Sequence, residues 1–332
     1  MEVAPFHLQI ACDDDSAVAE ARRAAMTLAD AVGLDELARG RLALVVTELG
    51  TNVRKHAGYG VFLLGRAPED EGGGVDVFAI DQGPGMADVE RCLRDGVSSA
   101  GTRGAGLGAV QRLSDVFDVF SAPQRGTVVF ARVRRGAPQR QTFERIGLAL
   151  RFPGEEVCGD AWVFEAEGER ARFAVVDGLG HGVLAASAAA AVVRGFPADA
   201  DEPQQWLEGA HRAARGTRGA AATVVFCDGS RGRATVTGLG NVAVRLVDPS
   251  GATSAVTMHG TLGHGTPRFR AQTYDWPGGW VVVHSDGLSP RWNVTPDDPL
   301  WRQSAGVVAA VLWRDFHRQR DDATIFVCRR HA

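Results

Sequence analysis

Four aspartates in the second half of the chain lie in settings that suit a divalent metal ion. Each lies at the end of an apolar run or beside a glycine: Asp160, Asp177, Asp286 and Asp321. Hard divalent cations bind several carboxylate oxygens at short range. Strand ends followed by glycine turns can bring such carboxylates from distant parts of a chain to one point. A single aspartate before glycine is more often a turn residue than a ligand, but four such positions together favour a metal cluster.

Polar residues at helical spacing in the first half suit a nucleotide site. Glu48, Asn52 and His56 recur every fourth residue, and Lys55 falls on the same face of a helix. Asn and Glu can hold a magnesium ion and a water, while Lys or His can contact phosphate oxygens. Glu48 is a candidate general base for an incoming hydroxyl. A simple solvated face is the alternative interpretation of this helix.

Two glycine-rich segments extend the nucleotide hypothesis. Asp81 follows an apolar strand and precedes Gly83 and Gly85, so its carboxylate can accept a hydrogen bond from an exocyclic amine such as that of adenine. The glycines let the backbone pass close to a flat ring, although an ordinary Asp-Gly turn is the alternative. Residues 101–108 then lead into a helix, whose N-terminus and loop N–H groups can cradle an anion. This loop is neither a Rossmann fingerprint nor a Walker loop.

Composition and charge limit the classes of function. The chain has 332 residues, enough for two domains, and its 45% hydrophobic and 23% charged residues are typical of a globular protein. The net charge is −4 with no basic block, so nucleic acid is not an expected partner. None of the five cysteines forms a Cys-x-x-Cys pair, which predicts neither a zinc site nor a disulfide framework.

Targeting signals are not evident in the sequence. The first residues show no basic leader and no apolar signal core. The most apolar helical run, Val183 to Val193, is shorter than the roughly 20 residues that a membrane span needs. Unpaired cysteines are typical of reduced thiols in the cytosol. We therefore expect a cytoplasmic protein that does not bind membranes.

Periodicity and turn residues predict the elements that position these groups. In the first half they predict strands at 6–10, 75–80 and 126–130, helices at 17–32, 35–56 and 107–117, and a glycine-rich connection at 58–74. In the second half they predict strands at 146–152, 161–165, 172–176, 222–227, 234–239, 242–247, 280–285 and 324–328, and helices at 183–194, 203–214 and 304–317. The polar stretch 134–142 contains Gly and Pro, so we place a linker at 136–142 between domains at 1–135 and 143–332.

The order of the motifs in the first half carries a resemblance. Glu48-x-x-x-Asn52-x-x-Lys55-His56, the Asp81 turn, a glycine lid and Gly-Thr are similar to the GHKL ATP-binding family, over about residues 5–133. Within it, the chain looks most like the serine kinases of bacterial anti-sigma partner-switching systems, stressosome switch kinases in particular. The resemblance implies a Bergerat α/β sandwich, Mg-ATP and transfer of the γ-phosphate to a protein serine or threonine. It implies that Glu48 is the general base, that Asn52 is the magnesium ligand and that Asp81 hydrogen-bonds adenine. The further residues of the implied nucleotide pocket are Lys55, His56, Gly83, Gly85, Gly104, Gly106, Leu107, Gly108 and Thr127.

The second half carries another resemblance. Residues 175–182, 285–288 and 321–324 resemble the metal motifs of PPM-type serine/threonine phosphatases, in the short bacterial branch that includes sporulation and stress-response phosphatases. The likeness covers about residues 143–330. It implies a β-sandwich flanked by helices, with two Mn²⁺ or Mg²⁺ ions that activate a shared water and clamp the phosphate. The implied ligands are Asp160, Asp177, the carbonyl of Gly178, Asp286 and Asp321.

Three details of the second resemblance stay open. Asp160 is followed by Ala161 and Trp162, without the second acid that many bacterial members carry there. Asp321 is the expected ligand by motif position, although Asp322 is adjacent. His181 is a candidate contact for phosphate or water, and a structural role in the turn is the alternative.

Together the two halves predict a fold of two α+β domains and a bifunctional switch protein. The first half would phosphorylate a small antagonist protein and the second would remove phosphate from it or from a related one. The resemblance implies that this antagonist is of the STAS class, and a sigma factor or stressosome proteins are further candidate partners. The alternative is a phosphatase whose first half only binds ATP, or acts as an anti-sigma module. A third hypothesis is a non-enzymatic scaffold in which both sites are degenerate. The intact sets of candidate ligands argue against it.

Overall fold

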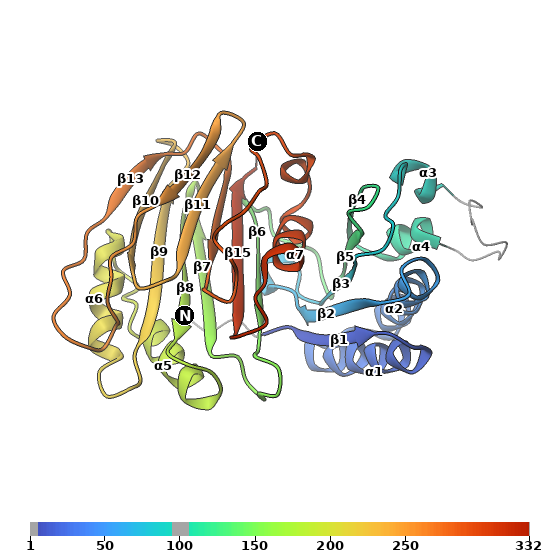
Figure 1. The fold of residues 1–332 in the computed structure, drawn as a ribbon, viewed down its shortest axis with the longest axis horizontal. Helices are drawn as coiled ribbons and strands as arrows, with labels where there is room; N and C mark the ends of the chain where they lie inside the picture. The colour runs from blue at the N-terminus through green and yellow to red at the C-terminus, as the bar shows by residue number, and fades with distance from the viewer. Residues whose placement is uncertain (1–5, 95–105, 332) are drawn as a thin grey trace. The chain divides into compact units, whose positions relative to one another are not determined.

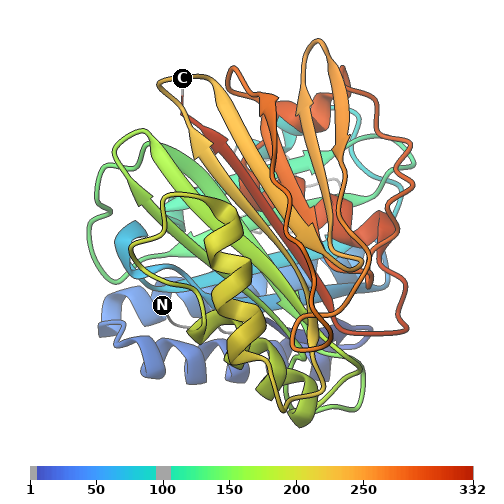
Figure 2. The same ribbon diagram turned by 90° about the vertical axis from the view of Figure 1, so that its left-hand side faces the viewer.

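The computed structural model describes residues 6–94 and 106–331, and these fold into two compact units that mix helices and sheets (Figures 1 and 2). One unit consists of residues 7–140 and 302–311, and the other contains the rest of the described chain. The predicted fold of two α+β domains is confirmed. No helix or strand lies between residues 133 and 143, but the domain boundaries at 135 and 143 stay a prediction.

The unit that begins at residue 7 is built on one antiparallel sheet of five strands. Its strand order is β1-β2-β3-β5-β4. The strands are β1 (Leu8–Cys12), β2 (Gly60–Arg66), β3 (Val75–Asp81), β4 (Val116–Ser121) and β5 (Thr127–Val133). The helices are α1 (Asp15–Val32), α2 (Glu36–His56), the short 3-10 helix η1 (Glu69–Glu71), α3 (Val89–Leu93) and α4 (Gly106–Leu113).

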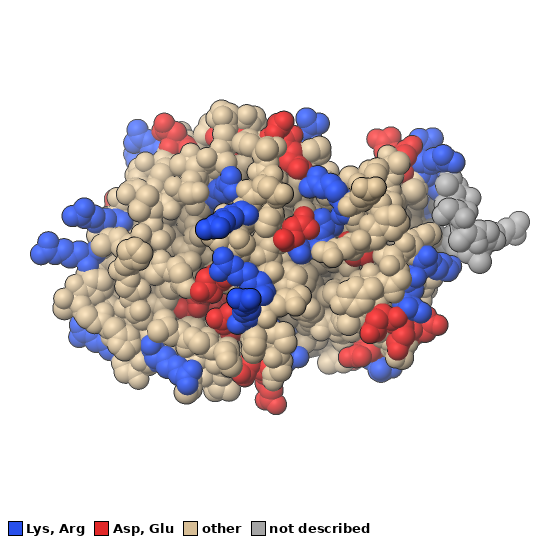
Figure 3. Space-filling model, in the orientation of Figure 1, with Lys and Arg blue, Asp and Glu red and all other residues tan. Residues whose placement is uncertain are grey.

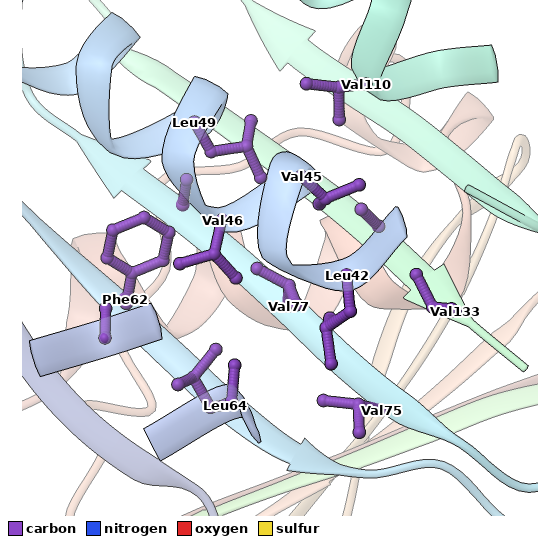
Figure 4. Close-up of a cluster of buried hydrophobic side chains, with 14 of the residues drawn as sticks. Leu42, Val45, Val46, Leu49, Phe62, Leu64, Val75, Val77, Val110 and Val133 are labelled. Atoms are coloured by element: carbon purple, nitrogen blue, oxygen red, sulfur yellow. The ribbon is translucent and has the colours of Figure 1, made fainter. Parts of the chain in front are cut away.

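Helices α1 and α2 form where capping residues precede apolar periodicity. The carboxylate of Asp14 accepts a hydrogen bond from the N–H of Ala17 at 2.8 Å, and Asp35 accepts one from Ala38 at 2.7 Å. Helix α1 ends at Gly33, whose φ of +71° suits glycine. Helix α2 turns an apolar stripe towards β2 and β3 (Figure 4). Residues of α2 outside this stripe remain available for a site.

Two sequence predictions for this unit were wrong. The expected connection 58–74 contains strand β2, because Val61 to Leu64 is a continuous apolar run that the flanking glycines disguised. The expected helix 107–117 ends at Leu113, and β4 begins at Val116. Val119 and Phe120 of β4 are buried against the sheet, so tertiary packing overrides the helical pattern.

The other unit contains two five-stranded antiparallel sheets. Their orders are β13-β10-β9-β8-β7 and β12-β11-β14-β15-β6. The strands are β6 (Phe143–Leu150), β7 (Asp160–Glu167), β8 (Arg170–Gly178), β9 (Ala220–Asp228), β10 (Arg233–Leu239), β11 (Ala243–Asp248), β12 (Gly251–Ala255), β13 (Gln272–Asp275), β14 (Trp280–His284) and β15 (Ala323–Arg330). The helices are α5 (Val183–Arg194), α6 (Pro203–Ala213) and the 3-10 helix η2 (Pro299–Arg302). Helix α7 (Ala305–Phe316) is divided between the two units, because residues 302–311 belong to the first.

The two sheets pack face to face over aromatic residues. The ring centroids of Phe173 on β8 and Phe326 on β15 lie 4.9 Å apart, and those of Trp162 on β7 and Phe326 lie 5.2 Å apart. Helix α5 packs on β7 and β8, and α6 packs on β9 and β10, on the outer face of the first sheet (Figure 2). This is the predicted sandwich flanked by helices.

The strands that the sequence did not predict here are edge strands. In β12 and β13, Thr, Ser and Gln side chains leave no apolar alternation, and most of these residues are exposed. None of the helices in residues 6–94 and 106–331 is both long and apolar enough to cross a membrane.

Candidate active sites

Strand ends of both sheets bring the four predicted aspartates to one edge of the sandwich. Asp160 begins β7 and lies directly opposite Asp177 on β8. In the other sheet, Asp286 follows β14 and Asp321 precedes β15, and these two strands pair with His284 opposite Ile325. Residues that are more than 100 positions apart in sequence therefore meet at one edge.

Ser285 ties the two sheets together at this edge. Its hydroxyl donates a hydrogen bond to Oδ2 of Asp160 at 2.7 Å and accepts one from the N–H of Thr324 at 3.0 Å. Its own N–H donates to the carbonyl of Thr324 at 2.9 Å. Sequence analysis missed Ser285, although its position directly before the Asp-Gly pair was a usable signal. Ser285 holds the Asp160 carboxylate in place.

The electrostatics of the site are those of crowded, partly buried carboxylates. Burial, followed by the negative charges of Asp286 and Asp321, raises the pKa of Asp177 to about 8. Burial and then the charge of Asp177 raise the pKa of Asp160 well above its usual range. Burial also raises the pKa of Asp322. Like charges held this close repel one another, and a cation among them removes the repulsion.

The donor chemistry therefore fits a hard divalent metal, but the side chains do not form a ready-made cage. Within residues 6–94 and 106–331, no three His, Cys, Asp or Glu side chains converge as metal ligands do. The raised pKa values nevertheless identify the aspartates as neighbours. The ligand roles of Asp160, Asp177, Gly178, Asp286 and Asp321 stay predictions.

Glycines after two of the aspartates permit close packing. A Cβ atom on Gly178 would lie 2.2 Å from the carbonyl oxygen of Ala185 in α5. A Cβ atom on Gly287 would lie 2.0 Å from the carbonyl oxygen of Asp322. The Asp-Gly pairs thus let helix α5 and the segment before β15 approach the carboxylates.

Other polar residues surround the cluster. The side-chain amide of Asn241 donates to Oδ2 of Asp286 at 2.6 Å, a contact that the sequence did not suggest. Asp322 turns inward and accepts a hydrogen bond from the N–H of Phe152 at 2.8 Å. Nδ1 of His181 lies 2.5 Å from Oε1 of Glu155, so this histidine is held by an acidic partner in the turn before α5.

Ser285→Ala tests the bridge between the sheets. The change leaves the buried Asp160 carboxylate without its hydroxyl donor, so we expect a loss of about 1–3 kcal/mol in the free energy of unfolding. We also expect Mn²⁺ affinity to fall about 10- to 100-fold, because partners that orient ligands tune metal binding to that extent. Chemical denaturation and titration calorimetry measure the two effects. Wild-type values for both would show that Ser285 does not position Asp160.

In the other unit, the polar residues on α2 lie beside its buried stripe. Glu48 and Asn52 are half-buried, whereas Lys55 and His56 in the last turn are exposed. The buried Nδ2 atom of Asn52 has no hydrogen-bond partner in the part of the chain that the structure describes. Buried amide groups normally have partners, so this atom fits a position that faces a ligand.

The Asp81 turn packs against the end of α2. Oδ1 of Asp81 accepts hydrogen bonds from the N–H groups of Gly83 at 2.8 Å and Thr127 at 3.1 Å, which orients the carboxylate. The hydroxyls of Thr127 and Ser121 lie 3.0 Å apart. A Cβ atom on Gly83 would lie 2.7 Å from the Cβ atom of Ala57, the residue that caps α2. The two motifs of the nucleotide hypothesis therefore meet.

Gly85 adopts a conformation that other residues rarely adopt. Its φ is +69°, and a Cβ atom there would lie 2.0 Å from the carbonyl oxygen of Ala122. Gly106, Leu107 and Gly108 form the first turn of α4, and Leu107 belongs to the same apolar core as α2. Gly104 lies outside the described residues. The structure thus brings the start of α4 to the helix that carries Glu48 and Asn52.

Comparisons with known proteins agree with this division. Residues 12–133 match the family model for the histidine kinase-like ATPase domain. Residues 167–331 match the family model for stage II sporulation protein E (SpoIIE). The first match spans the candidate nucleotide site, and the second spans the candidate metal site except for Asp160, which precedes it.

Two curated relatives and one solved structure extend the agreement. The serine/threonine-protein kinase RsbT of Bacillus subtilis (strain 168) is 32% identical over 114 residues, 34% of this chain and 86% of RsbT. The phosphoserine phosphatase RsbX of the same organism is 28% identical over 156 residues, 46% of this chain and 77% of RsbX. A solved structure from work on the bacterial stressosome as a modular system adapted to control secondary messenger signalling is 26% identical, with a TM-score of 0.52. It covers 57% of this chain and 100% of its own.

The first half of the chain aligns with 86% of RsbT, and the SpoIIE match covers most of the second half. The chain belongs to the histidine kinase-like ATPase family and joins that domain to a PPM phosphatase domain of the SpoIIE type.

Proposed function

We propose that this protein is a bifunctional regulator of a bacterial partner-switching pathway. Its first half acts as an ATP-dependent protein serine/threonine kinase, and its second half as a metal-dependent phosphatase of phosphoserine or phosphothreonine. The observation that carries the proposal is the pairing of halves: one is similar to a protein kinase and the other to a phosphoserine phosphatase, each over most of the relative's length.

In the phosphatase half, Asp160, Asp177, Asp286, Asp321 and the carbonyl of Gly178 would hold two Mn²⁺ or Mg²⁺ ions. When bound, such ions lower the pKa of a shared water and neutralise the charge of the phosphate. The chain's own residues keep the carboxylates in position. The Ser285 hydroxyl orients Asp160, and the Asn241 amide orients Asp286.

In the kinase half, ATP and Mg²⁺ would bind between α2, the Asp81 turn and the start of α4. Glu48 would accept the proton of the substrate hydroxyl, and Asn52 would hold the magnesium ion. Two backbone N–H groups orient the Asp81 carboxylate, which would accept a hydrogen bond from the adenine amine. The remaining nucleotide contacts are Lys55, His56, Gly83, Gly85, Gly104, Gly106, Leu107, Gly108 and Thr127.

We propose small phosphoproteins of the STAS class as the common target, with a sigma factor or stressosome proteins as further partners in the cytoplasm. Two opposed activities on one phosphate would only hydrolyse ATP unless they act on different residues or at different times. The two halves therefore need different target serines or partner-controlled access.

The alternative is a phosphatase whose ATPase-like half binds ATP or a sigma factor without transferring phosphate. The orphaned Asn52 amide supports a ligand at this site but not phosphate transfer. Two assays on the wild-type chain distinguish the two possibilities. We expect it to hydrolyse p-nitrophenyl phosphate with Mn²⁺, and to transfer label from γ-labelled ATP to a purified single-domain STAS protein. ATP binding without transfer would support the alternative, and the absence of both activities would refute the proposal.

A further inference from the structure

Five arginines form an exposed basic patch on the phosphatase-type unit. Three belong to the end of α6 and the loop after it, and two to the connection between β12 and β13: Arg212, Arg215, Arg218, Arg268 and Arg270. No side chain in the described part of the chain forms an ion pair with any of the five. Figure 3 shows Lys or Arg side chains at its left-hand edge, where α6 and this connection lie in Figure 1. Uncompensated positive charge therefore collects on this surface.

The two segments of the basic patch are packed against each other. Nδ1 of His211 accepts a hydrogen bond from the N–H of Gly263 at 3.1 Å, and Nε2 of His264 lies 3.1 Å from the carbonyl oxygen of Arg218. The rings of His211 and Phe269 make an edge contact at 6.2 Å. These contacts hold the five arginines on one surface rather than on independent loops.

The charged groups around His211 are also mainly positive. Burial, followed by the positive charges of Arg215, His264 and Arg212, lowers the pKa of His211. Glu208 is an exposed acid on the preceding turn of α6, but it forms no ion pair with these arginines. The local field is thus positive.

The basic patch begins at the candidate metal site. Residues Ala220 and Ala221 at the start of β9 pair with Gly178 and Asp177 on β8. The carbonyl of Gly219 accepts a hydrogen bond from the N–H of Leu179 at 3.0 Å. A Cβ atom on Gly180 would lie 3.2 Å from Nη1 of Arg218, so this guanidinium reaches the loop that follows the predicted ligands.

Apolar side chains lie exposed in the same loop and in the first turn of α5. Leu179, Val183 and Leu184 have exposed fractions of 41%, 69% and 56%. Exposed apolar groups next to unpaired charges are typical of protein-binding surfaces. A protein substrate extends beyond the metal site, so its flanking residues can contact this surface.

We propose that the five arginines dock the acidic residues that flank the phosphorylated serine in the protein substrate. This inference rests on the proposed phosphatase function and assigns its substrate class: a phosphoserine segment with Asp and Glu around it. Charge complementarity of this kind accelerates association and excludes basic sequences, and salt screens it. The basic patch thereby supplies selectivity that the metal site alone lacks.

Two synthetic phosphoserine peptides of equal length test the proposal, one flanked by Asp and Glu and one by Lys. We expect the wild-type chain to hydrolyse the acidic peptide with a kcat/KM about tenfold higher or more at low salt, and this ratio to shrink at high salt. The double variant Arg215→Glu with Arg268→Glu should lose or invert the preference. Its kcat/KM for p-nitrophenyl phosphate should equal that of the wild type.

Arg231→Glu with Arg233→Glu is the matched control. Both arginines are exposed in the hairpin between β9 and β10, at the opposite end of β9 from Ala220, and their reversal should leave the peptide preference intact. An unchanged preference in the Arg215/Arg268 variant, or an equal loss on p-nitrophenyl phosphate, would overturn the proposal.

Failure of the phosphatase function itself would appear differently. In that case the wild-type chain hydrolyses neither peptide nor p-nitrophenyl phosphate. Fluorescence anisotropy of the labelled peptides then measures the basic patch directly, because binding does not require hydrolysis. Tighter binding of the acidic peptide, lost on charge reversal, would support the docking surface, and equal binding of the two peptides would refute it.

Discussion

Asp177→Asn should abolish hydrolysis of p-nitrophenyl phosphate while making the metal-free protein more stable. Asp177 has Asp160 opposite it and the charges of Asp286 and Asp321 nearby, so it is central to the predicted metal site. We expect activity with Mn²⁺ to fall about 10³-fold or more, and the rise in Tm that Mn²⁺ causes in the wild type to disappear. Removing one of several crowded carboxylates also removes repulsion among them. The same change that abolishes activity should therefore raise the stability of the metal-free protein.

The stability effect has a defined pH dependence. The pKa of Asp177 is raised from 3.8 to about 8 in the folded chain, so the folded state binds a proton that the unfolded state releases above about pH 4. The metal-free wild type therefore loses stability as pH rises from about 4 to about 8. We expect Asp177→Asn to be more stable by about 1–3 kcal/mol at pH 8, and the difference to be smaller at pH 5.

Thermal unfolding in a chelator, at both pH values, measures this difference. Asp199→Asn is the matched control, because Asp199 is exposed in the loop between α5 and α6. That variant should behave as the wild type in every assay. A metal-free Asp177→Asn protein that is less stable than wild type at pH 8 would contradict the carboxylate cluster as described.

Glu48→Ala should abolish phosphate transfer from ATP to a STAS protein and leave ATP binding intact. Glu48 is half-buried on the face of α2 that also carries Asn52, and we assign it the role of base. Loss of a general base lowers a rate about 10²- to 10⁴-fold. Calorimetry with ATP and Mg²⁺, together with label transfer, separates the chemical step from binding.

Asp81→Asn provides the complementary result. Its carboxylate is oriented by the N–H groups of Gly83 and Thr127. Its replacement should therefore weaken ATP binding about tenfold or more, because it disturbs the proposed hydrogen bond to the adenine amine. Glu20→Ala on the exposed side of α1 is the control and should change neither property. Undiminished label transfer by Glu48→Ala would refute the role of this residue, and loss of ATP affinity in the same variant would assign it to binding.

Local chemistry accounts for the parts of this protein that can be read along the chain. Asp14 and Asp35 mark the starts of α1 and α2, because a short carboxylate accepts hydrogen bonds from the first free N–H groups of a helix. The four-residue spacing of Glu48 and Asn52 specifies one helix face whatever surrounds it. The Asp-Gly pairs mark the strand ends because glycine tolerates the close backbone approach that Gly178 and Gly287 show.

Long-range packing determines the rest. Strand β4 follows α4 because Val119 and Phe120 are buried by the sheet, and no local pattern contains that information. Ser285 meets Asp160 only because the two sheets stack face to face, and Asn241 meets Asp286 because β11 and β14 pair with Ala243 opposite His284. The arginines of residues 212–218 and 268–270 form one surface only after His211 binds Gly263. Side-chain types and spacing thus specify which chemistry is present, whereas strand register and sheet packing set which groups meet, because contacts between distant residues depend on the whole fold.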